Sequence, residues 1–269
     1  MKIAYHFLDN LLGWQLGTYV SLDSKQKRLA SSVFKDFHSW HRRTQLPSYS
    51  QYFTQTKALM AQGNITAEQL HAESDKLQDL LDVSVDYLMP GVVEIIGTFN
   101  EDQVAEILKN LKEKGDDFYD KRVDTSAKKI QKLRIKDFNQ HLEGFFGSYS
   151  DEQELEIKLW AKNLQPYEAL MLKQKRTWEQ DIAKALTKRN NPKELTRELK
   201  SLVMYRTDEW DADLQKVLDE NQVKSYGLLA NLANSRSERQ KTKSNEKFDR
   251  YIKIFDDMTS HQPASEPSN

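Results

Sequence analysis

The stretch LDSKQKRLASSVFKDFHSW, residues 22–40, predicts a long α-helix with a defined start. Asp23 follows the apolar Leu22, and Gln26 stands three residues after Asp23. This is a capping box: the Asp side chain accepts a hydrogen bond from a first-turn N–H, and the Gln side chain reaches back to the N–H of the cap. Apolar residues then recur every three or four positions, which places them on one helical face; they are Leu29, Val33, Phe37 and Trp40.

The same pattern of an apolar residue, a small polar residue and a Gln three positions later occurs three more times. We predict a helix start at each of these places: Ile65-Thr66…Gln69, Phe99-Asn100…Gln103 and Tyr149-Ser150…Gln153. A further start is predicted at Asn191-Pro192, because Pro suits the first helical position, where its missing N–H costs nothing.

Breaks between the helices are expected where Gly and Pro gather. Pro47 should end or kink the helix that starts near Asp23, and Met89-Pro90-Gly91 should be a clear break. The other joints are predicted at Gly63-Asn64, Gly144 to Ser148, Gln165-Pro166 and Asn190 to Pro192. Two long helices, over residues 100–121 and 124–146, are expected to lie antiparallel to each other.

These signals predict an all-α fold, an irregular antiparallel helical bundle. No run alternates apolar and polar residues as a sheet would need, and the unequal intervals between the capping Gln residues argue against a strict repeat. One bundle and two sub-bundles both fit. The division we predict is an N-terminal bundle over 1–148, a C-terminal bundle over 149–258 and a disordered tail over 259–269.

Composition limits the partners. The 40 Lys and Arg residues nearly cancel the 41 Asp and Glu residues, giving a formal net charge of -1. Global charge therefore gives no reason to expect nucleic acid or a membrane surface as the partner. The chain has no Cys, which rules out disulfides and thiolate chemistry. No stretch is long and apolar enough to span a bilayer, and the N-terminal residues do not form a signal peptide.

The densest cluster of unusual side chains precedes Pro47. His38, His41 and Arg42 share a helical face, and with Arg43 they form a candidate site for an anion or a partner carboxylate. In the alternative interpretation, Trp40 belongs to the core and the cations suit the dipole at a helix C-terminus. The sequence favours this alternative.

Motifs for other chemistry are missing. There is no His-Glu-x-x-His, no Gly-x-Ser-x-Gly and no Gly-rich phosphate loop, so we predict no metal, no cofactor and no enzymatic activity. The basic run from Ser235 to Lys247 is interpreted as solvent-exposed. The five Trp residues are expected to be core residues with satisfied indole N–H groups; they are Trp14, Trp40, Trp160, Trp178 and Trp210.

Several segments resemble a family of uncharacterised predicted lipoproteins of Gram-negative bacteria. The most specific is Trp40-His41-Arg42-Arg43-Thr44-Gln45-Leu46-Pro47-Ser48-Tyr49, and the likeness covers roughly the first two-thirds of the chain. Weaker likeness is found at Leu8-Asp9 through Trp14, Tyr19-Val20, Leu22 to Gln26, Phe99 to Gln103, Tyr149 to Gln153 and Lys175 to Trp178. The resemblance implies a periplasmic protein anchored to the outer membrane by a lipid. We expect a leader with a lipid-carrying Cys to precede residue 1 in the native protein.

Three hypotheses follow for function. The first is a non-enzymatic envelope protein that binds or scaffolds a protein or another envelope component and touches the membrane only through its lipid anchor. The second is a periplasmic chaperone or stress protein, since the polar-x-x-Gln helix starts resemble those of the Spy and CpxP type. The third is an enzyme with a dispersed polar site near His38, His41 and Arg42.

Overall fold

The structure is a computed structural model that describes residues 5, 8–119, 122–123, 125–203 and 210–260. These residues contain ten α-helices and no strand, which confirms the all-α prediction. The helices are α2 (Leu8–Gly17), α3 (Ser24–Gln62), α4 (Ala67–Gly97), α5 (Glu101–Tyr119), α6 (Ala127–Phe146), α7 (Asp151–Asn163), α8 (Glu168–Thr187), α9 (Pro192–Val203), α10 (Ala212–Asn234) and α11 (Glu238–Ser260). No described helix is long and apolar enough to cross a membrane.

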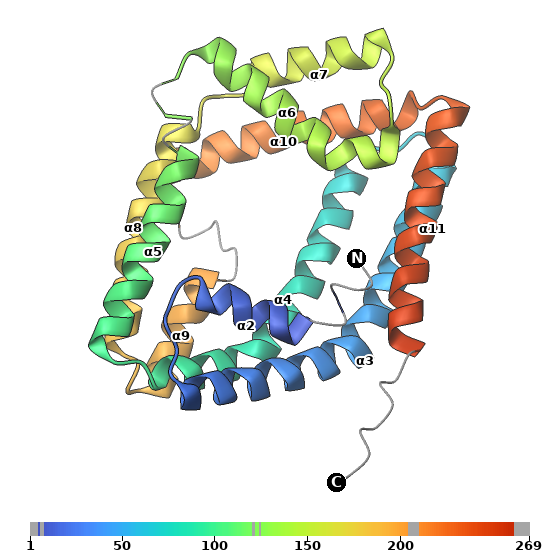
Figure 1. Cartoon of the computed structure of the whole chain (residues 1–269). Helices are drawn as coiled ribbons and strands as arrows, with labels where there is room; N and C mark the ends of the chain where they lie inside the picture. The colour runs from blue at the N-terminus through green and yellow to red at the C-terminus, as the bar shows by residue number, and fades with distance from the viewer. Residues whose placement is uncertain (1–4, 6–7, 120–121, 124, 204–209, 261–269) are drawn as a thin grey trace.

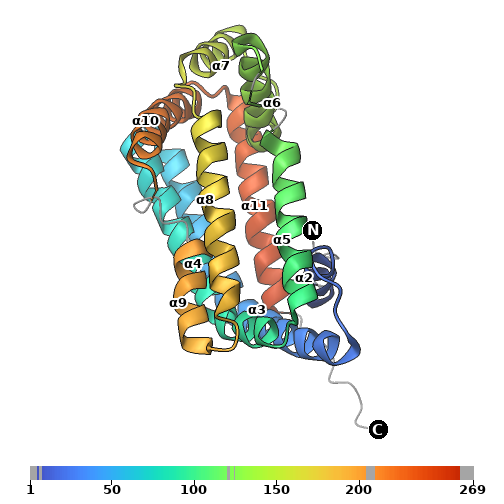
Figure 2. The same ribbon diagram turned by 90° about the vertical axis from the view of Figure 1, so that its left-hand side faces the viewer.

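The helices form an open four-sided frame (Figure 1). In that view, α3 runs along the lower edge, bends and continues upward beside α11, while α5 and α8 form the left edge. The helices α6, α7 and α10 form the upper edge. Turned by a quarter, the molecule is much narrower, with α7 at one end and α3 at the other (Figure 2). The described helices thus pack as a bundle that is opened into a frame.

Pro47 and Pro90 lie inside α3 and α4 without ending either helix. The break predicted at Met89-Pro90-Gly91 is therefore wrong: the helix continues, and both helices bend instead (Figure 1). A proline removes one intrahelical hydrogen bond and tilts the chain, and tertiary packing can maintain the helix on both sides. At Gly91 this packing is very close, because a Cβ there would lie 2.3 Å from Cγ1 of Val33.

The helix starts follow the predicted caps. The reciprocal cap bonds form at Asp23, Thr66 and Ser150, and at Asn100, whose Oδ1 accepts from the N–H of Gln103 at 2.9 Å. A fifth capping box, Ser237 with Gln240, begins α11. It escaped the sequence analysis because Arg236, not an apolar residue, precedes Ser237. Arg236 is itself buried and donates to the carbonyl of Met60. The prediction that the basic run is solvent-exposed is therefore wrong for Arg236.

The predicted antiparallel pairing of the helices after Asn100 and after residue 124 is wrong. Instead, α5 packs against α8, and α6 packs against α7 and α11. The most extensive helix pair is α3 with α11, from opposite ends of the chain. The division at residue 148 stays a prediction. Thr259 and Ser260, which were predicted to belong to the tail, lie in α11; residues 261–269 lie outside the described residues, and the tail stays a prediction there.

The second half of the chain repeats the arrangement of the first. With the capping Gln residues aligned, the first part of α3 corresponds to α7, and α5 corresponds to α11. Contacts follow this correspondence: α5 packs on α8 as α11 packs on α3, and α4 packs on both α9 and α10. Each half therefore supplies a helix to the other half's edge, and the frame closes on itself.

Two buried amide pairs join equivalent corners of the frame. The Nε2 of Gln26 donates to Oε1 of Gln103 at 3.0 Å, and Gln103 returns the bond at 2.7 Å. Each amide also donates to a loop carbonyl, of Thr98 and Ser21 respectively. These Gln side chains thereby cap their own helices and at the same time join α3 to α5, although the two residues are 77 positions apart in the chain.

The second pair repeats this geometry between α7 and α11. Gln240 donates to Gln153 at 2.8 Å and receives a bond at 3.3 Å. The additional carbonyl partners are those of Ser235 and Ser148. The spacing is conserved between the halves of the chain, since Ser21 to Gln26 corresponds to Ser148 to Gln153, and Thr98 to Gln103 corresponds to Ser235 to Gln240. The corners are thus fixed by polar bonds as well as by apolar packing.

Candidate functional site

The cluster before Pro47 lies where α2, α3 and α11 meet. Nδ1 of His41 is 2.9 Å from the hydroxyl of Tyr5. Nδ1 of His38 is 3.6 Å from a carboxylate oxygen of Asp9, and the His38 ring packs edge-on against Tyr5. Two of the predicted side chains therefore attach the N-terminal segment to α3.

Arg42 points toward the end of α11. Its Nε donates to the carbonyl of Met258, in the last turn of that helix, where a cation is favoured by the unpaired carbonyls and the helix dipole. Its Nη2 is buried and forms no hydrogen bond within the described part of the chain. A buried guanidinium N–H without a partner is costly, so an anionic or carbonyl group would pair favourably with this donor.

Arg43 lies apart from these three side chains, whereas the Trp40 ring lies edge-on to His41 with a centroid distance of 6.4 Å. The Trp40 ring stacks on Tyr87 of α4 with a centroid distance of 3.9 Å and an interplanar angle of 6°. Arg43 is exposed on the outer side of α3. The structure therefore brings together His38, His41 and Arg42 and separates them from Arg43. Their partners Tyr5 and Met258 had no signal in the sequence, because one is a distant side chain and the other a backbone carbonyl.

His41 is neutral at physiological pH. Burial lowers the pKa of its imidazole to about 4, and the neighbouring His38 contributes to the lowering. Burial also raises the pKa of the Tyr5 hydroxyl, so both partners of this hydrogen bond stay uncharged. An anion at this place would be held by the charge of Arg42, with His41 acting as a neutral partner.

The neutral His41 makes stability depend on pH. Its pKa in the folded protein lies below the ordinary value of 6.5, so the unfolded chain takes up the proton first as the pH falls. The stabilisation that the buried, neutral His41 provides is complete above about pH 6.5, and it is lost as the pH falls from about 6.5 to 4. We expect the stability difference between the parent and His41→Gln, measured by urea denaturation, to narrow over this range. A difference that stays constant would contradict a buried neutral His41.

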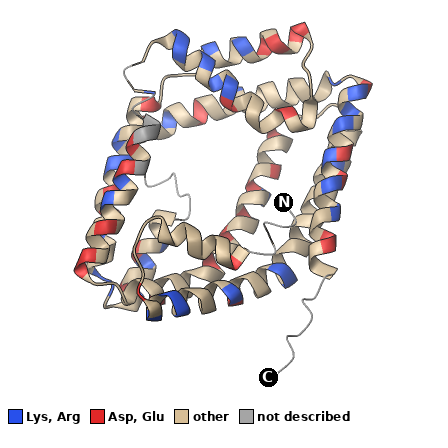
Figure 3. Cartoon of the chain, viewed as in Figure 1, with Lys and Arg blue, Asp and Glu red and all other residues tan. Residues whose placement is uncertain are grey.

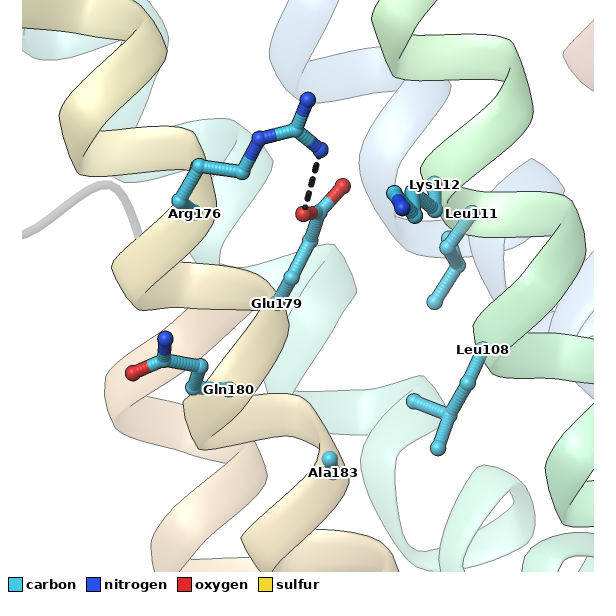
Figure 4. A pocket seen from close by; sticks show the side chains of 7 residues that line it. All are labelled: Leu108, Leu111, Lys112, Arg176, Glu179, Gln180 and Ala183. Carbon is cyan, nitrogen blue, oxygen red and sulfur yellow. Dashed lines mark hydrogen bonds and ion pairs between the residues drawn. The ribbon is translucent and has the colours of Figure 1, made fainter.

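An open groove lies between α5 and α8 (Figure 4). It has a volume of about 470 Å³ and is lined by Leu108, Leu111, Lys112, Arg176, Glu179, Gln180 and Ala183. Arg176 is 3.0 Å from Glu179 and 2.7 Å from Asp116, and Lys175 pairs with the same two acids. These charges neutralise one another across the two helices, so the network ties α5 to α8.

A larger hollow of about 690 Å³ lies among α6, α7, α8 and α10. Its aromatic lining includes Phe138, Trp160 and Tyr167. The Trp160 N–H donates to Ser225, as expected for a core Trp, and the Trp178 N–H donates to the carbonyl of Leu202. Trp14 differs from the prediction, because 65% of it is exposed. Among the described residues, no group of three or more His, Asp or Glu side chains is arranged to hold a metal.

A comparison with protein-family models identifies the family of the chain. A family of unknown function, DUF6279, matches residues 18–215. The chain belongs to this family. A search of proteins with curated functions and a search of solved structures each found no match.

The matched region of this DUF6279 protein contains most of the features described above. It runs from the loop before α3 to the first turn of α10 and includes His38, His41, Arg42 and Arg43. Three of the four paired Gln residues also lie within it. Gln240 and the α11 carbonyl that receives Arg42 lie beyond the matched residues, so the frame of this DUF6279 protein is completed by a helix outside the match.

Proposed function

We propose that the protein is a non-enzymatic binding or scaffold module of the bacterial cell envelope, periplasmic and lipid-anchored in its native form. The observation that carries the proposal is the closed frame with its two buried amide pairs. Such a frame holds distant helices in a fixed arrangement without depending on a single compact core. A fixed shape with several separate edges suits a protein that positions partners.

A large surface supports this proposal. The chain exposes 16539 Å², whereas a compact monomer of this mass is expected to expose about 12,000 Å². The apolar core is correspondingly divided into four clusters, which lie at different contacts between helices. Much of the chain is therefore available for contact with other molecules.

The resemblance to envelope lipoproteins supports the proposed location, and the family match covers the segment on which that resemblance is strongest. The large apolar side chains that are exposed in the described residues are spread over α2, α4, α7, α9 and α10. Scattered exposed apolar residues are ordinary on protein surfaces. They do not favour the chaperone hypothesis over a binding module.

The test uses the native protein expressed from its own gene. We expect it to fractionate with the envelope and to incorporate labelled palmitate. A photo-crosslinking amino acid placed at Leu155 or Leu159, which are 56% and 47% exposed on α7, should give a discrete crosslinked partner. The same amino acid at Leu195, which is fully buried, should give none. A cytoplasmic, unlabelled protein without crosslinks at exposed positions would overturn the proposal.

A further inference from the structure

A row of basic and small polar side chains runs along the outer face of α3. Its members are spaced three or four residues apart, so they share one face of the helix, and all of them are exposed. The row extends about 27 Å at the usual rise per residue. We name it the basic stripe; it consists of Lys25, Arg28, Ser32, Lys35, Ser39 and Arg43.

The four cations of the stripe form no ion pair with the described residues; the nearest ion pairs along the chain are those of His38 and Lys57. At one end of the stripe, the carboxylate of Asp23 interacts electrostatically with Lys25 and Arg28. The only acid within α3 up to Pro47 is Asp36, and its Oδ2 accepts the hydroxyl of Tyr87 at 2.9 Å. Figure 3 shows the resulting series of Lys and Arg residues along the lower edge of the frame.

The fold does not require cations on this face. Alignment of the capping residues Gln26 and Gln153 makes α7 the equivalent of this part of α3. There, Glu152 takes the place of Lys25, and Leu155 and Leu159 take the places of Arg28 and Ser32, whereas Lys162 keeps the cation of Lys35. Three of these four positions thus tolerate acidic or apolar residues, so the fold does not require the full row of cations.

We propose that the basic stripe lies on an anionic phospholipid bilayer and binds its phosphate groups. This inference adds a direct membrane contact to the lipid anchor, which was expected to be the only one, and it rests on the envelope location given in the proposed function. A straight row of cations at one outer edge matches a planar array of phosphates. Arg28 and Arg43 can each hold a phosphate with two parallel bonds, whereas Lys25 and Lys35 act as point charges.

The composition of the stripe favours a lipid surface over single-stranded nucleic acid. Binding to single strands relies on aromatic side chains that stack on the bases, and no aromatic residue belongs to the stripe. Ser32 and Ser39 are short, so the longer Lys and Arg side chains can reach one plane. Each cation near an anionic membrane is expected to strengthen binding about fivefold, equivalent to about 1 kcal/mol.

The test is co-sedimentation of the full chain with phosphatidylcholine vesicles that contain or lack phosphatidylglycerol. We expect binding only to the anionic vesicles, and weaker binding at high salt. The variant K25Q/R28Q/K35Q/R43Q should bind at least about tenfold more weakly. The control K128Q/K132Q/R239Q/R250Q removes four exposed cations from α6 and α11. This control has the same net charge as the stripe variant, but it should bind the vesicles as the parent does.

Circular dichroism and thermal melting check that both variants fold. Equal losses of vesicle binding in the two variants would overturn the proposed role of the basic stripe and would indicate attraction through net charge alone. Absence of binding to anionic vesicles would overturn it as well, and so would stronger binding to single-stranded or duplex DNA or to an acidic peptide. The palmitate and fractionation assay reports separately on the proposed function, so failure of the vesicle assay alone leaves the envelope module in place.

Discussion

Replacing Arg134 by Met is expected to lower the free energy of unfolding by about 3–5 kcal/mol, since it leaves a buried carboxylate without its partner. Arg134 of α6 is 2.8 Å from Glu168, and each of these side chains is only 10% exposed. The guanidinium also donates to the carbonyls of Ala161, Leu164 and Gln165 at the end of α7. One side chain therefore satisfies a buried acid and closes the loop between α7 and α8.

The matched control is Arg197→Met. Arg197 forms an ion pair with Glu198 at 2.7 Å, but the two side chains are 74% and 41% exposed. Water screens such a pair, so we expect a loss between zero and about 1 kcal/mol. Urea denaturation of both variants, followed by circular dichroism, gives the comparison. Equal losses in the two variants would show that the Arg134 network does not carry the stability assigned to it.

Replacing Gln153 by Ala is expected to cost about 2–4 kcal/mol, because several buried polar groups lose their partner together. The amide of Gln240 loses its reciprocal bonds. The N–H of Ser150 loses the capping acceptor that it bonds at 3.1 Å. The same substitution removes a contact between α7 and α11, made by two residues that are 87 positions apart in the chain. Urea denaturation measures the loss.

Gln69 provides the control, because it occupies the same position in the capping box of α4 but is exposed and pairs with no second Gln in the described residues. Gln69→Ala should cost only about 0.5–1 kcal/mol, the usual contribution of a cap. If both substitutions had similar effects, the amide pairs would be ordinary caps. A double-mutant cycle of Gln26→Ala and Gln103→Ala then measures the coupling across the other corner.

The candidate site could be predicted only in part. The spacing of His38, His41 and Arg42 placed them on one face of α3, and they do lie together. Sequence could not supply their partners on the N-terminal segment and on α11. It also could not show that the face with Lys25, Arg28, Lys35 and Arg43 is exposed, because exposure depends on which side of α3 the other helices cover.

The sequence by itself determined where α3, α4, α5 and α7 begin, because a capping box is formed by groups three residues apart and needs no partner from elsewhere. For that reason the sequence was sufficient to predict four helix caps, which are Asp23, Thr66, Asn100 and Ser150. Only the tertiary structure decided that α3 and α4 continue through Pro47 and Pro90, and that capping Gln residues pair across the frame. These outcomes depend on side chains brought together from distant parts of the chain, and local spacing carries no record of them.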